Sequence, residues 1–486
     1  MRFAESSESI LARLGALRDA DAPTHGGHVL SYVYDPGVAE LDALAAEAVR
    51  MMQPVNGLDP TTFGSVAVLE RELIAFTREL LNGGDDVVGT VTSGGTESCL
   101  LAVKTARDAW LAVRGAEPGT ARPRLVAPVT VHAAFQKAAH YFGLELDLAP
   151  VLPSGVVAAS ELVARLGDDV ALVVVSAPSY PHAGLDPVVE VASAASAQGI
   201  PVHVDACIGG LALPFWPELP DWDFRVPGVT SISADLHKYG YAPKGASVLL
   251  QRGRDRQRLQ YFATARWPGY PVVNSTLLGS KSGGPLAAAW AIVHALGREG
   301  FAELAEQTRA ATLALRATID GIEGLRIVGE PTGPLFAVAT DDALPAERRV
   351  DPHVWADAAK REGWILQTQP GLTQTDGSLL PHTTHLTITP VTASVLDELQ
   401  PALVRSADAV RGVPRPDISG LLGALPPLPG MPDSDTAAAL LVGFGINGSG
   451  ALPEEFAPLI AAIEALPAPL AERLLIELLA RLVEPR

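Results

Sequence analysis

The feature that most constrains the fold is an alternation of short apolar runs with helical segments between about residues 61 and 290. The apolar runs are rich in β-branched residues, which favour strands. Such runs alternating with helices predict a mostly parallel sheet covered on both faces. The sequence predicts strands at 87–92, 124–127, 172–176, 202–205, 231–234 and 247–250, and helices at 66–81, 97–113 and 133–142.

After about residue 300 the pattern becomes that of a smaller α+β domain. It comprises a long helix at 301–319, a helix at 354–362 and strands near 325–329, 335–339, 364–368 and 385–389. Six prolines between 414 and 432 predict an extended linker, followed by an amphipathic helix at 471–483. We therefore expect an N-terminal arm (1–60), a large domain (61–300), a small α+β domain (301–411) and a proline-rich linker with a helical tail (412–486).

Composition excludes several classes of protein. The 486 residues are 48% hydrophobic and 19% charged, as in a folded chain with a large core. The net charge of -19 argues against nucleic acid as a partner, because a duplex would be repelled. Cys99 and Cys207 lie in apolar segments, which predicts reduced thiols and a cytoplasmic location. The first residues do not resemble a signal peptide, and no transmembrane segment is predicted.

Three motifs follow predicted strands, at the sheet edge where ligands bind in such folds. Ser93-Gly94-Gly95-Thr96 opens a helix, whose free N–H groups suit a phosphate; the alternative is an ordinary turn capped by Thr96. Asp205 ends an apolar strand, where a carboxylate needs a cationic partner or, alternatively, a backbone amide. Lys238 lies on a turn where its amine can be partly desolvated and neutral, although an isolated lysine is usually a solvated surface group.

A phosphate cradle, an acid and a lysine are the groups that hold pyridoxal phosphate. The cradle binds the phosphate, the acid keeps the pyridine nitrogen protonated and the lysine forms a Schiff base. Around them, His132 can stack on the ring, His203 can touch the cofactor from the same side as Asp205, and His237 adjoins the lysine. Lys244 can supply charge to a phosphate. The alternatives are a capping or core histidine at 132, a core histidine at 203 and a surface lysine at 244.

No metal site is predicted. The pairs His25/His28 and His382/His385 share a three-residue spacing but lack cysteine or carboxylate ligands at metal spacing. The segment Gly445–Gly450 contains a serine but follows no convincing strand, so the sequence does not support a serine hydrolase.

At these motifs the chain resembles the sphingosine phosphate lyase family of fold-type I pyridoxal-phosphate enzymes, which is related to the group II amino-acid decarboxylases. The resemblance covers roughly residues 25–405. The matching segments are Val91–Ser98, His132–Ala139, Ser176–His182, His203–Gly210, Phe224–Asp235 and Ser233–Gly245.

The resemblance implies an α/β fold-type I enzyme that assembles as a homodimer, with active sites at the subunit interface. It implies Lys238 as the Schiff-base lysine, Asp205 on the pyridine nitrogen, His132 stacked on the ring and Lys244 near a phosphate. Two further residues stand where the family has aromatic active-site residues, namely Tyr34 and Tyr180.

The segment expected to face the substrate departs from the family pattern. Asn56 and Asp59 are predicted substrate contacts, but Asp59 replaces a histidine that is usual in the family. An anion there would repel a substrate phosphate. Gly279-Ser280-Lys281 likewise has a lysine where arginine is usual. The cofactor-binding residues are thus intact, while the substrate-facing residues are altered.

The function expected is that of a carbon–carbon lyase. It would cleave a phosphorylated amino alcohol, such as a phosphorylated long-chain base, by a retro-aldol reaction to an aldehyde and phosphoethanolamine. One alternative is an amino-acid decarboxylase, because the same ring stabilises that carbanion and the bond that breaks is the one perpendicular to the ring. Another is a non-catalytic paralogue that binds the cofactor, or partners through its C-terminal segment.

Overall fold

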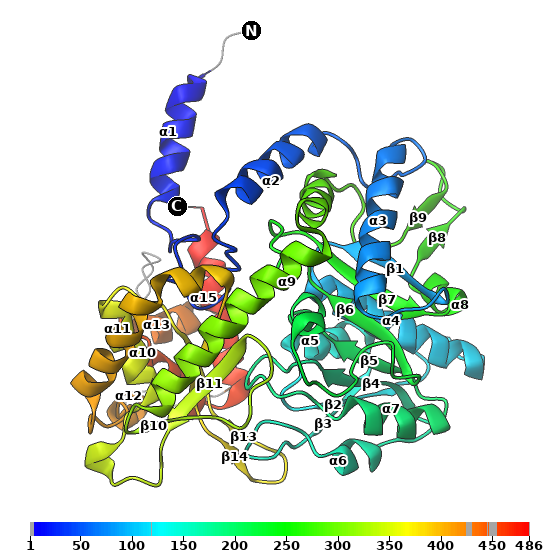
Figure 1. Cartoon of the computed structure of the whole chain (residues 1–486). Helices are drawn as coiled ribbons and strands as arrows, with labels where there is room; N and C mark the ends of the chain where they lie inside the picture. The colour runs from blue at the N-terminus through cyan, green and yellow to red at the C-terminus, as the bar shows by residue number, and fades with distance from the viewer. Residues whose placement is uncertain (1–3, 118, 424–429, 445, 447–453, 486) are drawn as a thin grey trace.

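The chain folds into two main domains that share one long helix, α9 (Gly284–Asp320) (Figure 1). The computed structural model describes residues 4–117, 119–423, 430–444, 446 and 454–485. None of the helices within these ranges combines the length and apolar character required to cross a bilayer. The N-terminal helix α1 (Ser7–Arg18) projects away from the body of the molecule (Figure 1).

The large domain is built on a seven-stranded sheet in the order β1-β7-β6-β5-β4-β2-β3. β7 is antiparallel to both of its neighbours and the remaining pairs are parallel, so the expected mostly parallel sheet is confirmed. The strands are β1 (Val87–Thr92), β2 (Arg124–Pro128), β3 (Glu145–Ala149), β4 (Val170–Ser176), β5 (Val202–Asp205), β6 (Val229–Ala234) and β7 (Ser247–Arg252).

Helices cover both faces of this sheet, because its central strands are apolar on both sides. Along β4 the side chains alternate between two cores: Val173 and Val175 pack in one, Leu172 and Val174 in the other. The helices of the large domain are α3 (Gly64–Leu80), α4 (Gly95–Arg114), α5 (Ala133–Phe142), α6 (Ala159–Val163), α7 (Val188–Ala197) and α8 (Arg254–Arg258).

The small domain has a four-stranded antiparallel sheet in the order β10-β11-β15-β12. The strands are β10 (Leu325–Ile327), β11 (Leu335–Thr340), β12 (Gln367–Gln369) and β15 (Thr383–Thr387). They pack against α10 (Pro352–Arg361) and α11 (Leu396–Val410). Two short hairpins complete the β structure: β8 (Phe262–Thr264) with β9 (Val272–Asn274), and β13 (Leu372–Thr373) with β14 (Leu379–Leu380).

The N-terminal arm packs against the small domain at residues 29–30. Val29 pairs with Ile365 beside the small sheet, and the Leu30 N–H donates to the Ile365 carbonyl at 2.9 Å. Leu30 is only 1% exposed and belongs to the small-domain core. The arm thus crosses the small domain before Tyr34 and continues into α2 (Ala39–Met52).

The helix expected at 301–319 is the second half of α9. At Gly297 the backbone leaves the helical region (φ 54°, ψ -173°) and the helix kinks. The first half packs in the large-domain core through Ala288 and Ile292, and the end of the second half packs in the small-domain core through Leu315. Beyond the kink, Phe301 and Leu304 still pack in the large-domain core, and the helix reaches the small-domain core at Ala311.

The C-terminal segment contains more helix than the sequence predicts. The described helices are α12 (Ser419–Gly423), α13 (Ser434–Gly443), α14 (Ala457–Ala465) and α15 (Ala468–Val483). The last three enclose a small apolar core that includes Leu440, Leu466 and Leu474. Part of the predicted proline-rich linker, 424–429, lies outside the described residues, as does most of Gly445–Gly450.

Candidate active site

The sheet topology brings the three predicted motifs to one edge. β1, β5 and β6 all end there, and β7 begins there because it runs in the opposite direction. Thr92 at the end of β1 pairs with Ser247 at the start of β7, and Asp205 at the end of β5 pairs with Ser233 on β6. The glycine-rich turn, the acid and the lysine turn therefore surround a common space.

Lys238 forms an ion pair with Asp235, and sequence reasoning missed this acid. Their Nζ and Oδ2 atoms are 3.0 Å apart, and the side chains are 19% and 1% exposed. Burial alone would lower the pKa of Lys238, but Asp235 and the other acidic groups around the amine together outweigh it and hold this pKa above its usual value. A neutral amine at Lys238 stays a prediction for the cofactor-bound protein. The sequence signal for this ion pair is an acid that lies three residues before the lysine and directly after a strand.

Asp205 is held by hydrogen bonds. Its Oδ1 atom accepts from the Cys207 N–H at 3.1 Å and from the Ser233 hydroxyl at 3.4 Å. The residue is 7% exposed, and within the described parts of the chain no lysine or arginine forms an ion pair with it. A buried carboxylate in this setting suits a protonated ring nitrogen.

His203 is a satisfied core histidine, and the structure favours this alternative over contact with the cofactor. The residue is fully buried, and its two ring nitrogens lie 2.8 Å from the Ser231 hydroxyl and 3.2 Å from the Ser233 hydroxyl. Burial lowers the pKa of His203 to about 4, so the ring is neutral at physiological pH. The Ser233 hydroxyl links His203 to Asp205, because it contacts both side chains.

The glycine-rich turn forms a close-packed cradle at the start of α4. The first helical turn leaves the N–H groups of Gly95 and Thr96 without intrahelical partners, as an anion site requires. The Ser93 N–H donates to Glu97 Oε2 at 2.6 Å, and contact of Ser93 with a cofactor phosphate stays a prediction. Glu97 also accepts from the Leu277 N–H at 2.8 Å, so this buried acid fixes the turn.

Gly95→Ala is expected to destabilise the protein by ~1–3 kcal/mol and to weaken cofactor retention. A Cβ atom at Gly95 would lie 2.6 Å from Asp235 Oδ2 and 2.8 Å from Cys207 Sγ. Thermal unfolding and the cofactor-to-protein ratio measure the two effects. Gly64→Ala is the matched control, since Gly64 also begins a helix but has nothing within 4 Å. Equal stability of the two variants would contradict the close packing.

Two predicted tyrosines lie near the lysine turn. Tyr34 packs edge-on against Tyr239 at 5.3 Å between ring centroids, and the Lys244 ammonium lies 4.7 Å from the Tyr34 ring centroid. Burial raises the pKa of Tyr34 to about 12. Tyr180 stacks on His385 at 4.5 Å, and burial raises its pKa as well. Both phenols therefore stay protonated and can donate hydrogen bonds.

His132 caps the helix α5, as one of the alternatives anticipated. Its Nδ1 atom accepts from the Ala134 N–H at 3.2 Å, and the residue is exposed. This bond leaves the flat faces of the ring available. Stacking of His132 on a cofactor ring stays a prediction.

Several buried polar atoms near Lys238 lack hydrogen-bond partners in the described structure. Asp235 Oδ1, His237 Nδ1 and the Tyr180 hydroxyl have no hydrogen-bond partner in the described structure. The other ring nitrogen of His237 lies 3.5 Å from Asp235, and burial lowers the pKa of His237. Unsatisfied buried groups are costly, so a polar ligand belongs in this space. Together with the cradle, Asp205 and Lys238, they fit pyridoxal phosphate.

Asn56 and Asp59 are not brought to Lys238 within one protomer. The hydrogen bonds of Asp59 come from Thr61 and Thr62 in its own turn, and the two hydroxyls lower the pKa of Asp59 to about 2. Asn56 Oδ1 accepts from the Lys281 N–H at 3.3 Å. Asp59 lines an open groove of about 1360 Å³ beside α3 and the β8–β9 hairpin, and Lys238 is not among the lining residues. Their contact with substrate stays a prediction that requires a second protomer.

Comparison with known proteins gives two family matches for this chain. Residues 34–337 match the family "Pyridoxal-dependent decarboxylase conserved domain", and residues 416–481 match "Pyridoxal-dependent enzyme, C-terminal putative HTH domain". The second match gives the C-terminal segment a counterpart that sequence reasoning did not find. The fold and the site thus define a pyridoxal-phosphate-dependent α/β enzyme.

Two named relatives and one solved structure narrow this class of pyridoxal-phosphate enzymes to one family. The sphingosine-1-phosphate lyase of Oryza sativa is 34% identical over 411 residues, which cover 83% of this chain and 72% of the relative. That of Rattus norvegicus is 38% identical over 69% of this chain and 59% of its own length. The solved sphingosine-1-phosphate lyase of Burkholderia pseudomallei superposes with a TM-score of 0.77 at 32% identity, covering 85% of this chain and 93% of the other.

The chain belongs to the sphingosine-1-phosphate lyase family, within the pyridoxal-dependent decarboxylases. Its cofactor is pyridoxal phosphate. The chain spans about three fifths of the length of the mammalian relatives it matches.

Proposed function

We propose that this protein is a carbon–carbon lyase that cleaves a phosphorylated amino alcohol, such as a phosphorylated long-chain base, to an aldehyde and phosphoethanolamine. The observation that carries the proposal is a second lysine, Lys244, near the expected Schiff-base lysine Lys238. Lys244 lies over Tyr34, and burial, followed by the nearby charge of Lys238, lowers the pKa of Lys244. One amine can join the cofactor while the other attracts a substrate phosphate. The similarity to named lyases supports this substrate class over amino acids.

The residues at the sheet edge divide the chemistry between them. Bound pyridoxal phosphate supplies an aldehyde for amines and a ring that accepts the electron pair of a broken bond. Lys238 would provide the amine that holds the cofactor. Asp205 would keep the proton on the pyridine nitrogen, and the N–H groups of Gly95 and Thr96 would bind the cofactor phosphate.

The reaction breaks one carbon–carbon bond. The substrate hydroxyl loses its proton, its carbon leaves as the aldehyde, and the bonding electron pair stays with the amine-bearing fragment. A proton added to that fragment gives phosphoethanolamine. The protonated hydroxyls of Tyr34 and Tyr180 are hydrogen-bond donors for the oxygen atoms involved.

Lys244 predicts a pH dependence of substrate binding. The residue is exposed, but its ammonium group is partly desolvated, and this burial together with the charge of Lys238 lowers the pKa of Lys244 to about 8. Lysine is charged below its pKa, so KM for a phosphorylated substrate is expected to rise above pH 8. Lys244→Arg should keep KM flat over this range, because a guanidinium remains charged. Identical KM profiles for the two proteins would exclude this role.

Product analysis tests the proposed reaction. The cofactor-loaded protein is incubated with a phosphorylated sphingoid base and, separately, with a panel of amino acids. Aldehyde and phosphoethanolamine are expected from the first, and no carbon dioxide from the second. Carbon dioxide without aldehyde would identify a decarboxylase. Cofactor binding without any product would favour a non-catalytic paralogue.

We also propose a cytoplasmic homodimer. The β8–β9 region exposes apolar side chains beside the groove of Asp59, and a second copy would cover them: Phe262, Trp267, Tyr270 and Val273. Such a contact would also let Asn56 and Asp59 reach the partner's site. Light scattering after size exclusion measures the assembly.

The proposed cytoplasmic location rests on the two buried thiols, neither of which is in a disulfide. The net charge of -19 still argues against nucleic acid as a partner.

A further inference from the structure

We propose that Cys99, Cys207 and Asp205 form a binding site for a thiophilic divalent cation, with Zn²⁺ as its probe, in the protein before pyridoxal phosphate binds. No metal site is predicted from the sequence, because that prediction rests on the two histidine pairs and does not include these cysteines. The two cysteines are 108 residues apart in the chain and meet only through the fold.

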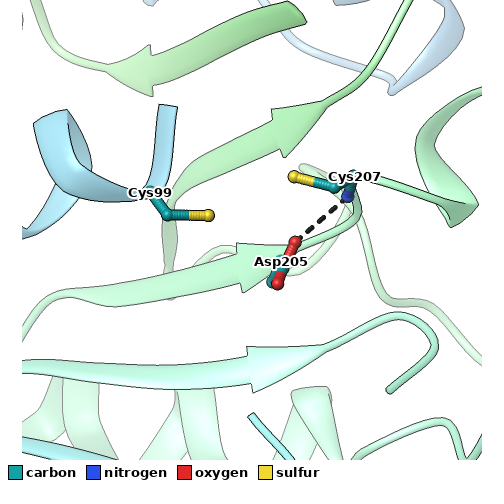
Figure 2. A group of neighbouring side chains, drawn as sticks. All are labelled: Cys99, Asp205 and Cys207. Carbon is teal, nitrogen blue, oxygen red and sulfur yellow. Dashed lines mark hydrogen bonds between the residues drawn. The ribbon is translucent and has the colours of Figure 1, made fainter. Parts of the chain in front are cut away.

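The three side chains converge at the end of β5 (Figure 2). Cys99 lies on α4, Asp205 ends β5, and Cys207 follows two residues later. Their ligand atoms all lie within 4.8 Å of one another, and the three residues are buried. Both sulfur atoms point into the space beside the Asp205 carboxylate (Figure 2). Neither thiol is in a disulfide.

This set of atoms matches the preferences of zinc. Two thiolates and a carboxylate are common zinc ligands, with Zn–S distances of about 2.3 Å and Zn–O distances of about 2.0–2.2 Å. Two sulfurs on one tetrahedral zinc are about 3.8 Å apart by that geometry, so the site needs to contract by no more than about 1 Å. The Ser233 hydroxyl, 3.3 Å from Cys207 Sγ, or a water can occupy the fourth position.

The surrounding charges favour a cation at this place. Asp205 has no cationic side chain paired with it in the described structure. Asp235 adds a second carboxylate, because a Cβ atom at Gly95 would lie within 2.8 Å of both its oxygens and of Cys207 Sγ. The ammonium of Lys238 opposes a metal, but Asp235 already pairs with it. On binding, one Zn²⁺ replaces one proton on each thiol, and both protons go to solvent.

A consequence for cofactor binding rests on the proposed role of Asp205. The Asp205 carboxylate cannot bind both Zn²⁺ and the pyridine nitrogen of the cofactor. The metal and pyridoxal phosphate are therefore expected to exclude each other, so that zinc slows the conversion of apoprotein to the active form.

Metal titration of the apoprotein tests the site directly. Apoprotein is prepared by removing the cofactor, and Zn²⁺ binding is measured by calorimetry. Cd²⁺ is used in parallel, because its bonds to thiolates give an ultraviolet absorbance. One equivalent is expected to bind to the wild-type chain, and Cys99→Ser is expected to weaken binding by more than about tenfold. Equal affinity of the two proteins would overturn the site.

Two further measurements keep the outcome clear. Zn²⁺ should protect both cysteines of the wild-type apoprotein from alkylation, as read by mass spectrometry, which needs no variant. Recovery of cofactor absorbance should be slowed by Zn²⁺ in the wild type and not in Cys99→Ser, which also shows that the variant folds. Alkylation unaffected by Zn²⁺ would refute the site. Failure of absorbance to recover without zinc would refute the proposed cofactor roles and leave the metal result standing.

Discussion

Lys238→Arg is expected to lower kcat by roughly a thousandfold or more while leaving the protein folded. The arginine keeps a positive charge next to Asp235, which now lies 3.0 Å from the lysine nitrogen. A guanidinium does not lose its proton at accessible pH and cannot join the cofactor aldehyde. The variant thus separates the covalent role of the amine from its ion pair. Borohydride reduction followed by peptide mass spectrometry should attach the cofactor to Lys238 only in the wild type.

Lys104→Arg is a closely matched control for this experiment. Lys104 is 18% exposed and lies 2.9 Å from Asp108, while Lys238 is 19% exposed and has a similar ion pair. Its ammonium contacts the carbonyl of Leu259, away from the sheet edge. Wild-type kcat is expected for Lys104→Arg. Retention of activity in Lys238→Arg, or reduction products on another lysine, would remove the basis of the proposed function.

Asp205→Asn is expected to lower kcat by about a hundredfold or more, with weaker cofactor binding. The amide oxygen can still accept from the Cys207 N–H, now 3.1 Å from the carboxylate, so the local fold is preserved. The negative charge is lost, and with it the attraction that keeps the pyridine nitrogen protonated. Single-turnover kinetics and the cofactor dissociation constant measure the two effects.

Asp186→Asn is the control for charge removal at a buried aspartate. Asp186 is 2% exposed and accepts from the Ser176 N–H at 2.8 Å, at the end of the neighbouring strand β4. Burial raises the pKa of Asp186 to about 7, so the acid is often neutral already and an amide imitates it. Near-normal kcat is expected. A loss as large as that of Asp205→Asn would mean that both variants act through the fold.

Much of the fold could be predicted because local and global preferences agree. β5 (Val202–Asp205) is a short apolar run ending in an acid, and α5 (Ala133–Phe142) lies between a capping histidine and a glycine; both match their predicted bounds. β3 (Glu145–Ala149) was not predicted, because two of its five residues are acidic, which an edge strand tolerates. α11 was not predicted either, and it carries Pro401 within the helix.

The site was predicted in outline because glycines, acid and lysine each follow a strand of the same sheet. Its partners could not be predicted, since they depend on register. Asp205 lies opposite Ser233 on β6, and this pairing places His203 behind serine hydroxyls. The ion pair of Lys238 with Asp235 follows from the shape of a turn. Asn56 and Asp59 are held by contacts with Lys281, Thr61 and Thr62, and the spacing of residues along the chain does not reveal these contacts.

The kink in α9 has a geometric consequence for the whole molecule. Gly297 joins two straight rods. The first is anchored in the large-domain core, and the second runs from that core, at Phe301 and Leu304, to the small-domain core, at Leu315. Each added or lost residue in either rod would rotate whatever is attached beyond it by about 100°. The angle between the two halves of the molecule therefore depends on a residue count and two dihedral angles, together with the packing of Leu335 and Leu380 in the large-domain core.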